Sequence, residues 1–144
     1  MAHGLLEGKK GIIFGALDPQ SIAWKVAEQA HAQGAKFTLT NAPIAMRMGK
    51  INELAEACGS IVIPADATSE EDLTNLFEKS MEELGGPLDF VLHSIGMSPN
   101  VRKGKHYTDL NYDFYHKTMD VSAMSLHKTL ATAMRLDALK EWGS

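Results

Sequence analysis

The sequence predicts an α/β fold: a Rossmann-like, doubly wound parallel sheet between two layers of helices, in a three-layer α/β/α arrangement. Short apolar runs alternate along the chain with stretches whose apolar residues recur at helical spacing. The first run, Gly11–Gly15, is apolar throughout, which is typical of a strand buried on both faces of a parallel sheet. Glycines at Gly34 and Gly85 close two of the helical stretches. This alternation builds a parallel sheet with right-handed crossovers, and all 144 residues are predicted to form one domain.

The first half of the chain supplies two strands. The strand over residues 11–15 is followed by a helix over residues 22–34. The apolar face of that helix comprises Ile22, Ala23, Val26, Ala27 and Ala30. Residues 36–40 (KFTLT) form the second strand, and residues 42–57 contain a helical run around Ile51, Leu54 and Ala55.

The second half supplies two more strands. Residues 61–63 (IVI) form the third, and Thr68 or Ser69 caps the next helix, whose first turn is acidic. The stripe of that helix comprises Leu73, Leu76, Phe77, Met81 and Leu84. Residues 88–93 (LDFVLH) form the fourth strand, and a long helix starts near Asn111. Its expected apolar stripe comprises Met119, Ala123, Leu126, Leu130 and Met134.

Composition excludes several classes of function. A net charge of −4 gives no general attraction to nucleic acid or to membrane phosphates. No stretch approaches the length of a membrane span, and the N-terminus lacks the apolar core of a signal peptide. The single cysteine, Cys58, fits a reducing cytoplasm. No two of the six histidines have metal-ligand spacing on a helix, so no metal site is expected.

Candidate ligand-binding residues follow the strands, because parallel sheets bind ligands beyond their carboxyl ends. Gly15 permits a tight turn after the first strand, and Ser21 is expected to cap the following helix, whose amides would face an anion. Only one of the three glycines of the dinucleotide-binding motif is present, so an ordinary turn remains the alternative. Asp66 follows the third strand, where a carboxylate can accept the amine of adenine, or it is simply a turn residue.

Two further strand ends carry candidates. Asn41 stands where an acid would hold an adenosine ribose, and it can bond a hydroxyl group there. Arg47 is near enough in sequence to reach a ribose phosphate. The segment Ser94-Ile95-Gly96 leaves the fourth strand, where glycine lets the backbone approach a ribose or merely ends the strand.

Together these motifs resemble one family. Gly15-Ala16 with Ser21-Ile22-Ala23, Asp66-Ala67, and Ser94-Ile95-Gly96 are similar to the cofactor motifs of bacterial enoyl-acyl-carrier-protein reductases, divergent short-chain dehydrogenases/reductases. The stretches SIAWKVA, LTNAPIAMRMG, FVLHSIGMSPNVRKG and HYTDLNYDFY extend the resemblance over essentially the whole chain. It implies reduction of a trans-2-enoyl thioester on acyl carrier protein in fatty-acid biosynthesis. It also implies NADH as cofactor, with NADPH possible through Arg47, and a homotetramer.

The resemblance also implies residue roles. Gly15 and Ala16 would contact the ribose and pyrophosphate side, and Ser21 and Ile22 would hold the pyrophosphate. Asp66 and Ala67 would bind adenine, and Asn41 would lie near the adenosine ribose. Ser94, Ile95 and Gly96 would line the nicotinamide ribose, with Met97 near the substrate pocket. A basic loop, Arg102, Lys103, Lys105 and His106, either receives the acidic carrier protein or is simply solvated.

The sequence departs from the family at its catalytic residues. The family uses a tyrosine with a lysine seven residues later, the tyrosine donating a hydrogen bond to the developing enolate. None of Tyr107, Tyr112 and Tyr115 has a lysine four or seven residues later, so no catalytic residue is assigned. We therefore expect a truncated chain, ending after the fourth strand and its long helix, that carries the cofactor-binding half and is inactive alone. In the sheet order 3-2-1-4-5, truncation would leave residues 90–92 as an exposed, aggregation-prone edge.

Two alternatives stay open at this point. One is another short-chain reductase, acting on a ketone or an alcohol. The other is a non-catalytic dinucleotide-binding module that ends at Ser144.

Overall fold

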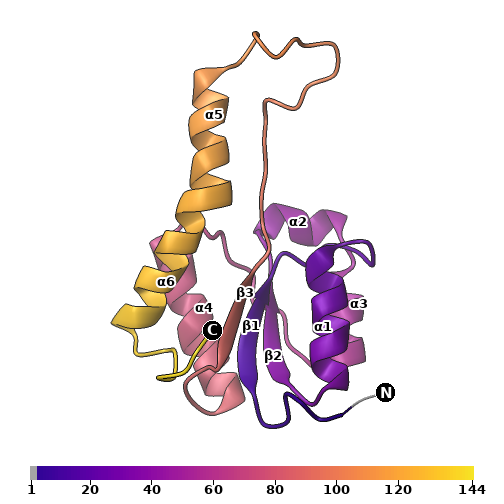
Figure 1. Cartoon of the computed structure of the whole chain (residues 1–144), viewed down its shortest axis with the longest axis vertical. Helices are drawn as coiled ribbons and strands as arrows, with labels where there is room; N and C mark the ends of the chain where they lie inside the picture. Colours follow the sequence, from indigo (N-terminus) through magenta and orange to yellow (C-terminus); the bar gives the residue numbers. More distant parts are fainter. Residues whose placement is uncertain (1–2) are drawn as a thin grey trace.

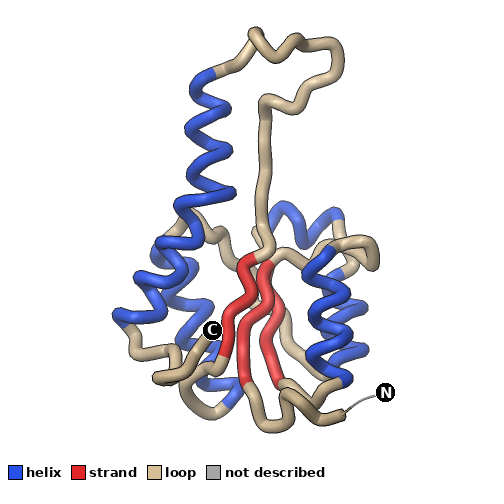
Figure 2. The backbone as a smooth tube through the Cα atoms, in the orientation of Figure 1, coloured by secondary structure: helices blue, strands red, loops and turns tan. Residues whose placement is uncertain are grey.

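A parallel sheet with helices on both faces forms the body of the protein (Figures 1 and 2). The computed structural model describes residues 3–144. The strands are β1 (Lys10–Phe14), β2 (Lys36–Thr40) and β3 (Phe90–His93), in the order β2-β1-β3. The helices are α1 (Ile22–Ala32), α2 (Pro43–Met48), α3 (Ile51–Cys58), α4 (Glu70–Leu84), α5 (Tyr112–Met119), the π-helical turn η1 (Asp120–Met124) and α6 (Ser125–Arg135). The Rossmann-like fold class is confirmed.

Alternate residues of β1 face opposite layers. Ile13 packs with residues of α1 and α3, whereas Ile12 and Phe14 pack with residues of α4 and α6. Every residue of the strand from Gly11 to Phe14 is buried. The apolar run therefore marks a strand covered on both faces, as the sequence predicts.

The third predicted strand is reduced to a single bridge. Val62 pairs with Leu39 of β2, which donates its N–H to the Ile61 carbonyl and accepts from the Ile63 N–H, each at 2.9 Å. The predicted strand has only three residues, 61–63, and they make just these two hydrogen bonds with Leu39. The predicted order 3-2-1-4 is retained, because the bridge lies on the side of β2 away from β1.

The expected exposed edge of β3 is partly paired. The Val91 N–H donates to the Ser144 carbonyl, and the Ser144 N–H donates to the Asp89 carbonyl. Phe90, Val91 and Leu92 are half-buried, not exposed. The edge is not fully exposed, because the tail after α6 turns back and runs beside the sheet (Figure 1).

The long helix starts where the sequence predicts but buries a different face. Asn111 caps it, its side-chain oxygen accepting from the Phe114 N–H at 3.0 Å. The predicted stripe is wrong: Leu126, Leu130 and Met134 are 45%, 46% and 70% exposed. The residues buried against the body are Ser125, Thr129, Thr132 and Ala133. The packed face of α6 carries mainly hydroxyl side chains, which a count of apolar residues does not select.

An arm extends from the body at the carboxyl ends of the strands. The loop after β3 runs outward and α5 returns beside it (Figure 2). No helix within residues 3–144 is long and apolar enough to cross a membrane.

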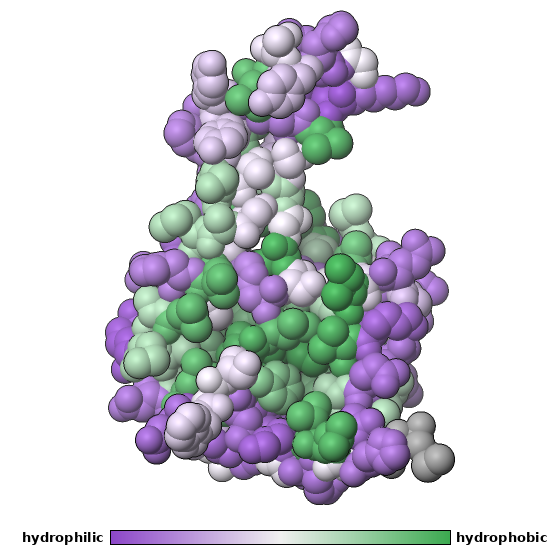
Figure 3. Space-filling model, in the orientation of Figure 1, coloured by the Kyte–Doolittle hydropathy of each residue, from purple (hydrophilic) through white to green (hydrophobic). Residues whose placement is uncertain are grey.

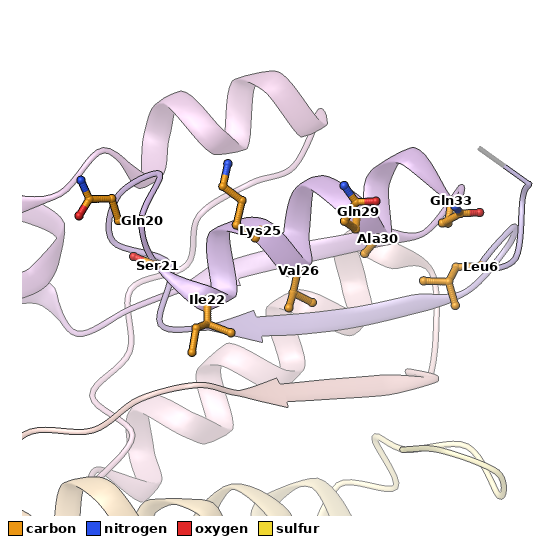
Figure 4. A pocket seen from close by; sticks show the side chains of 9 residues that line it. All are labelled: Leu6, Gln20, Ser21, Ile22, Lys25, Val26, Gln29, Ala30 and Gln33. Atoms are coloured by element: carbon orange, nitrogen blue, oxygen red, sulfur yellow. The ribbon is translucent and has the colours of Figure 1, made fainter. Parts of the chain in front are cut away.

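An apolar groove of about 550 Å³ runs along α1. Leu6, Ile22 and Val26 lie in line along one side of the helix (Figure 4), and Figure 3 shows apolar side chains gathered on this face. Ile22 is 76% exposed. An exposed apolar surface of this kind favours association between chains.

We expect Val26→Lys to weaken self-association of the chain, because a charge in the groove must be desolvated when two copies meet. Light scattering over a concentration series should give a lower average mass for the variant than for the unchanged chain. Met48→Lys is the control, since Met48 is 79% exposed but lies outside the groove. An unchanged chain that stays monomeric, or an equal effect of both substitutions, would contradict this expectation.

Candidate functional site

A cavity of about 300 Å³ lies at the carboxyl ends of the strands. Segments after β1, after β2, after the 61–63 bridge and after β3 all contribute to its lining. Of the predicted site residues, it brings together Gly15, Asn41, Asp66, Ala67, Ser94, Ile95, Gly96 and Met97. Val121 of η1 adds a fifth segment, so the cavity is lined by parts of the chain that are distant in sequence.

Gly15 allows the loop after β1 to lie against the loop after β3. Its φ is +96°, in the region that favours glycine, and a Cβ there would overlap the Ser94 carbonyl oxygen. Its N–H donates to the Thr40 carbonyl at 3.0 Å. One residue thus joins the ends of three neighbouring strands.

Ser21 stands at the cap position of α1 but does not cap the helix with its side chain. The Ser21 hydroxyl instead accepts from the N–H groups of Leu17 and Asp18, at 3.1 and 3.0 Å. The predicted capping bond is therefore wrong, because the loop folds back and places those two amides nearer to the hydroxyl. Ser21 fixes the loop conformation in place of the helix end.

Ala16, Ser21 and Ile22 are not among the residues that line the cavity. Ala16 is fully buried, whereas Ser21 and Ile22 line the groove along α1 (Figure 4). Ile22 is 76% exposed, and its side chain borders this groove and not the cavity.

Asn41 ties the end of β2 to the first loop. Its side-chain N–H donates to the Ala16 carbonyl at 3.1 Å, and its side-chain oxygen accepts from the Ala42 N–H at 2.9 Å. Each polar atom retains capacity for a further bond, since an amide carries two donors and two acceptor lone pairs.

Asp66 holds a carboxylate at one end of the cavity. One oxygen accepts from both the N–H and the hydroxyl of Thr68, at 2.9 and 2.7 Å. Led by the backbone bond from Thr68, these contacts lower the pKa of Asp66 below its ordinary value, although burial opposes them. The group is ionised at neutral pH, and within residues 3–144 its second oxygen accepts no hydrogen bond, whereas the next residue, Ala67, is buried.

The segment after β3 forms the other end of the cavity with its backbone. A Cβ at Gly96 would lie in van der Waals contact with the Ser122 side chain, 3.6 Å from its hydroxyl oxygen. Met97 is 41% exposed and lines the cavity. Hydrogen bonds between the Ser122 side chain of η1 and the Met97 backbone hold this segment. The sequence did not predict these bonds.

Several lining residues were missed by sequence reasoning. They are Phe14, Leu17, Ala42, Ile44, Ala45, Ala65, Thr68 and Val121. Thr68 could have been found from the sequence, since its position two residues after Asp66 is typical of an Asx turn. Arg47 lies exposed on α2 and does not line the cavity.

The comparisons with known proteins now decide the family. The family model described as enoyl-(acyl carrier protein) reductase matches residues 15–144. The chain belongs to this family. An enoyl-acyl-carrier-protein reductase (NADH) of Aquifex aeolicus is 35% identical over 124 residues, covering 85% of this chain and 45% of that protein. The resemblance carried by the sequence motifs is confirmed.

Solved structures agree with the family. A FabI–NADH complex from Alistipes finegoldii gives a TM-score of 0.95 at 60% identity, covering 98% of this chain and 50% of that one. A reductase from Anaplasma phagocytophilum in complex with NAD gives 0.83 at 30% identity, covering 96% and 52%. The chain spans about half the length of the curated relatives it matches.

His93, the last residue of β3, generates a pH prediction. Burial lowers the pKa of its imidazole below the ordinary value of 6.5. The unfolded chain therefore binds a proton before the folded chain does as the pH falls below 6.5. We expect the free energy of unfolding to decrease from pH 6.5 down to the folded-state pKa and to lose no more from this group below it.

Urea unfolding at pH 7.5 and 5.5 checks this, with His93→Gln expected to reduce the difference between the two measurements. His127→Gln, at an exposed position on α6, is the control and should keep the difference of the unchanged chain. An NMR titration that gives His93 a pKa above 6.5 would refute the prediction.

Proposed function

We propose that this chain binds NADH at the carboxyl ends of its strands, as the cofactor-binding half of an enoyl-acyl-carrier-protein reductase of fatty-acid biosynthesis. The observation that carries the proposal is the cavity itself, which gathers Gly15, Asp66 and the 94–97 segment from separate strand ends. Relatives with the same fold are described as NADH and NAD complexes.

The residues present fit a dinucleotide. The second oxygen of Asp66 would accept the adenine amine, and the small side chain of Ala67 would leave room for the base. Gly15, Ala16, Ser21 and Ile22 follow β1, where their backbone can approach the pyrophosphate, and Asn41 can bond the adenosine ribose. Ser94, Ile95 and Gly96 can line the nicotinamide ribose, with Met97 toward the substrate. NADH is favoured over NADPH because Arg47 lies outside the cavity lining.

Within residues 3–144, no tyrosine lines the cavity to donate a hydrogen bond to an enolate, which is the role of the tyrosine in this family. When bound, the nicotinamide supplies a hydride to the β-carbon of the enoyl thioester. Tyr107, Tyr112 and Tyr115 are 96%, 74% and 46% exposed, and none lines the cavity. This supports the proposal that the chain holds the cofactor and lacks the group that polarises the thioester.

The proposed partners are an acidic carrier protein and further copies of the chain. Arg102 donates to the Asp109 carbonyl and lies over the Phe114 ring, so it fixes the loop, whereas Lys103, Lys105 and His106 are exposed and available to a carrier protein. The exposed side of α6, with Leu126, Leu130 and Met134, supports a homotetramer of the whole enzyme. A cytoplasmic location accords with Cys58, which is a free thiol.

Two alternatives differ in what they predict. The family match favours an enoyl reductase over a short-chain reductase acting on ketones or alcohols. A non-catalytic module that binds NADH without using it is separated from the proposed half-enzyme by whether the chain continues beyond Ser144 in its gene.

We expect Asp66→Asn to weaken NADH binding about tenfold to a hundredfold, the size of a lost hydrogen bond to a charged group. The asparagine oxygen keeps the bond from Thr68, so the side-chain NH₂ would face the adenine amine and repel it. Fluorescence titration of NADH measures the effect, and Glu70→Gln, exposed on α4 outside the cavity, is the control.

A hypoxanthine analogue of NADH sharpens this test, because it carries an oxygen in place of the amine. The Asp66→Asn variant should bind the analogue at least as well as the unchanged chain does. Equal affinity of both proteins for NADH would show that Asp66 does not contact the base.

We expect the 144-residue chain to oxidise no NADH in the presence of a trans-2-enoyl thioester beyond the rate in buffer alone. The reason is the missing tyrosine and lysine, since the cofactor alone does not polarise the thioester. Absorbance of NADH follows the reaction, with the full-length Alistipes finegoldii enzyme as positive control. Turnover by this chain at a comparable rate would overturn the proposal of an inactive half.

A further inference from the structure

Two serine hydroxyls, Ser122 of η1 and Ser125 at the start of α6, lie against the segment around the end of β3. The Ser122 hydroxyl accepts from the Met97 N–H at 3.0 Å and donates to the Met97 carbonyl at 3.2 Å. One side chain therefore contacts both backbone polar groups of a residue 25 positions away. This contact fixes the C-terminal flank of the Ser94–Gly96 backbone.

Ser125 holds the other flank through His93. Its hydroxyl donates to the Val121 carbonyl at 2.7 Å and lies 2.8 Å from His93 Nε2. Because the hydroxyl proton goes to Val121, His93 Nε2 is the donor in the second bond. Ser125 is fully buried, so this bond is protected from water.

Ser122 and Ser125 are three residues apart, a spacing that puts two side chains on the same side of a helix. A π-helical turn has poorer hydrogen-bond geometry than an α-helix and is found mostly at functional sites. Here η1 lies opposite the 93–97 segment, and its Val121 also lines the cavity. Ser122 and Ser125 contact the two residues that flank Ser94–Gly96, one at each end.

We propose that Ser122, supported by Ser125, is a positioning residue that sets the Ser94–Met97 backbone for the nicotinamide end of the dinucleotide. The inference rests on the proposed NADH site. The adenosine end is built separately, on Asp66 and Asn41, so loss of Ser122 should affect one end of the ligand only.

The test compares NADH with ADP, which lacks the nicotinamide and its ribose, by calorimetry on the whole chain. Ser122→Ala should raise the NADH dissociation constant about fivefold to tenfold, the effect of a net hydrogen bond, and leave the ADP constant within about twofold. Ser122→Thr keeps the hydroxyl and should restore NADH binding to within about threefold of the unchanged chain.

Thr129→Ala is the matched control. Thr129 lies on α6 and donates its hydroxyl to the Ser125 carbonyl at 2.7 Å, so its loss weakens the same helix without touching the 93–97 segment. We expect it to lower the melting temperature while leaving both dissociation constants unchanged. A loss of NADH and ADP binding in equal measure for Ser122→Ala would show general destabilisation and overturn the inference.

The remaining outcomes separate this inference from the proposed function. If the unchanged chain binds both ligands and Ser122→Ala binds NADH equally well, the positioning role is wrong and the NADH site stands. If Ser122→Thr fails to restore binding, the hydroxyl is not the active feature and the inference also fails. If the unchanged chain binds neither ligand, the proposed function fails, and the positioning role fails with it.

Discussion

The close approach of Gly15 to the Ser94 carbonyl is the constraint on which the cavity depends. A side chain at residue 15 would occupy the space of that carbonyl oxygen. The same glycine is hydrogen-bonded to Thr40, so it cannot move away without breaking the contact between β1 and β2 at their carboxyl ends. Holding three strand ends this closely lets residues far apart in sequence line one small cavity.

Features that depend on neighbouring residues could be predicted from the sequence. Ser69 accepts from the Asp72 N–H and Asn111 from the Phe114 N–H, because capping bonds reach only three residues along the chain. The predicted capping bond at Ser21 is absent, although serine is a residue type that commonly caps helices. A hydroxyl accepts from the nearest amides, and a loop that folds back brings Leu17 and Asp18 closer than the helix end.

The buried face of the long helix could not be predicted by counting apolar residues. The counted stripe is exposed on both sides of η1, at Met119 before it and at Leu126, Leu130 and Met134 after it. Three of the four residues that α6 buries carry a hydroxyl group, and Thr129 donates its hydroxyl to the carbonyl four residues earlier. Counting apolar residues therefore passed over the face that packs against the body and selected the face that is exposed.

The two ends of the cavity differ in how sequence specifies them. Asp66 acts through its own side chain, and its geometry is set by Thr68 two residues away. The Ser94–Gly96 segment offers its backbone, and that backbone is placed by hydroxyls at residues 122 and 125. A motif at residues 94–96 is thus necessary but not sufficient for its geometry. A change in the hydroxyls of η1 and α6 would alter this end of the site while every cofactor motif remained intact.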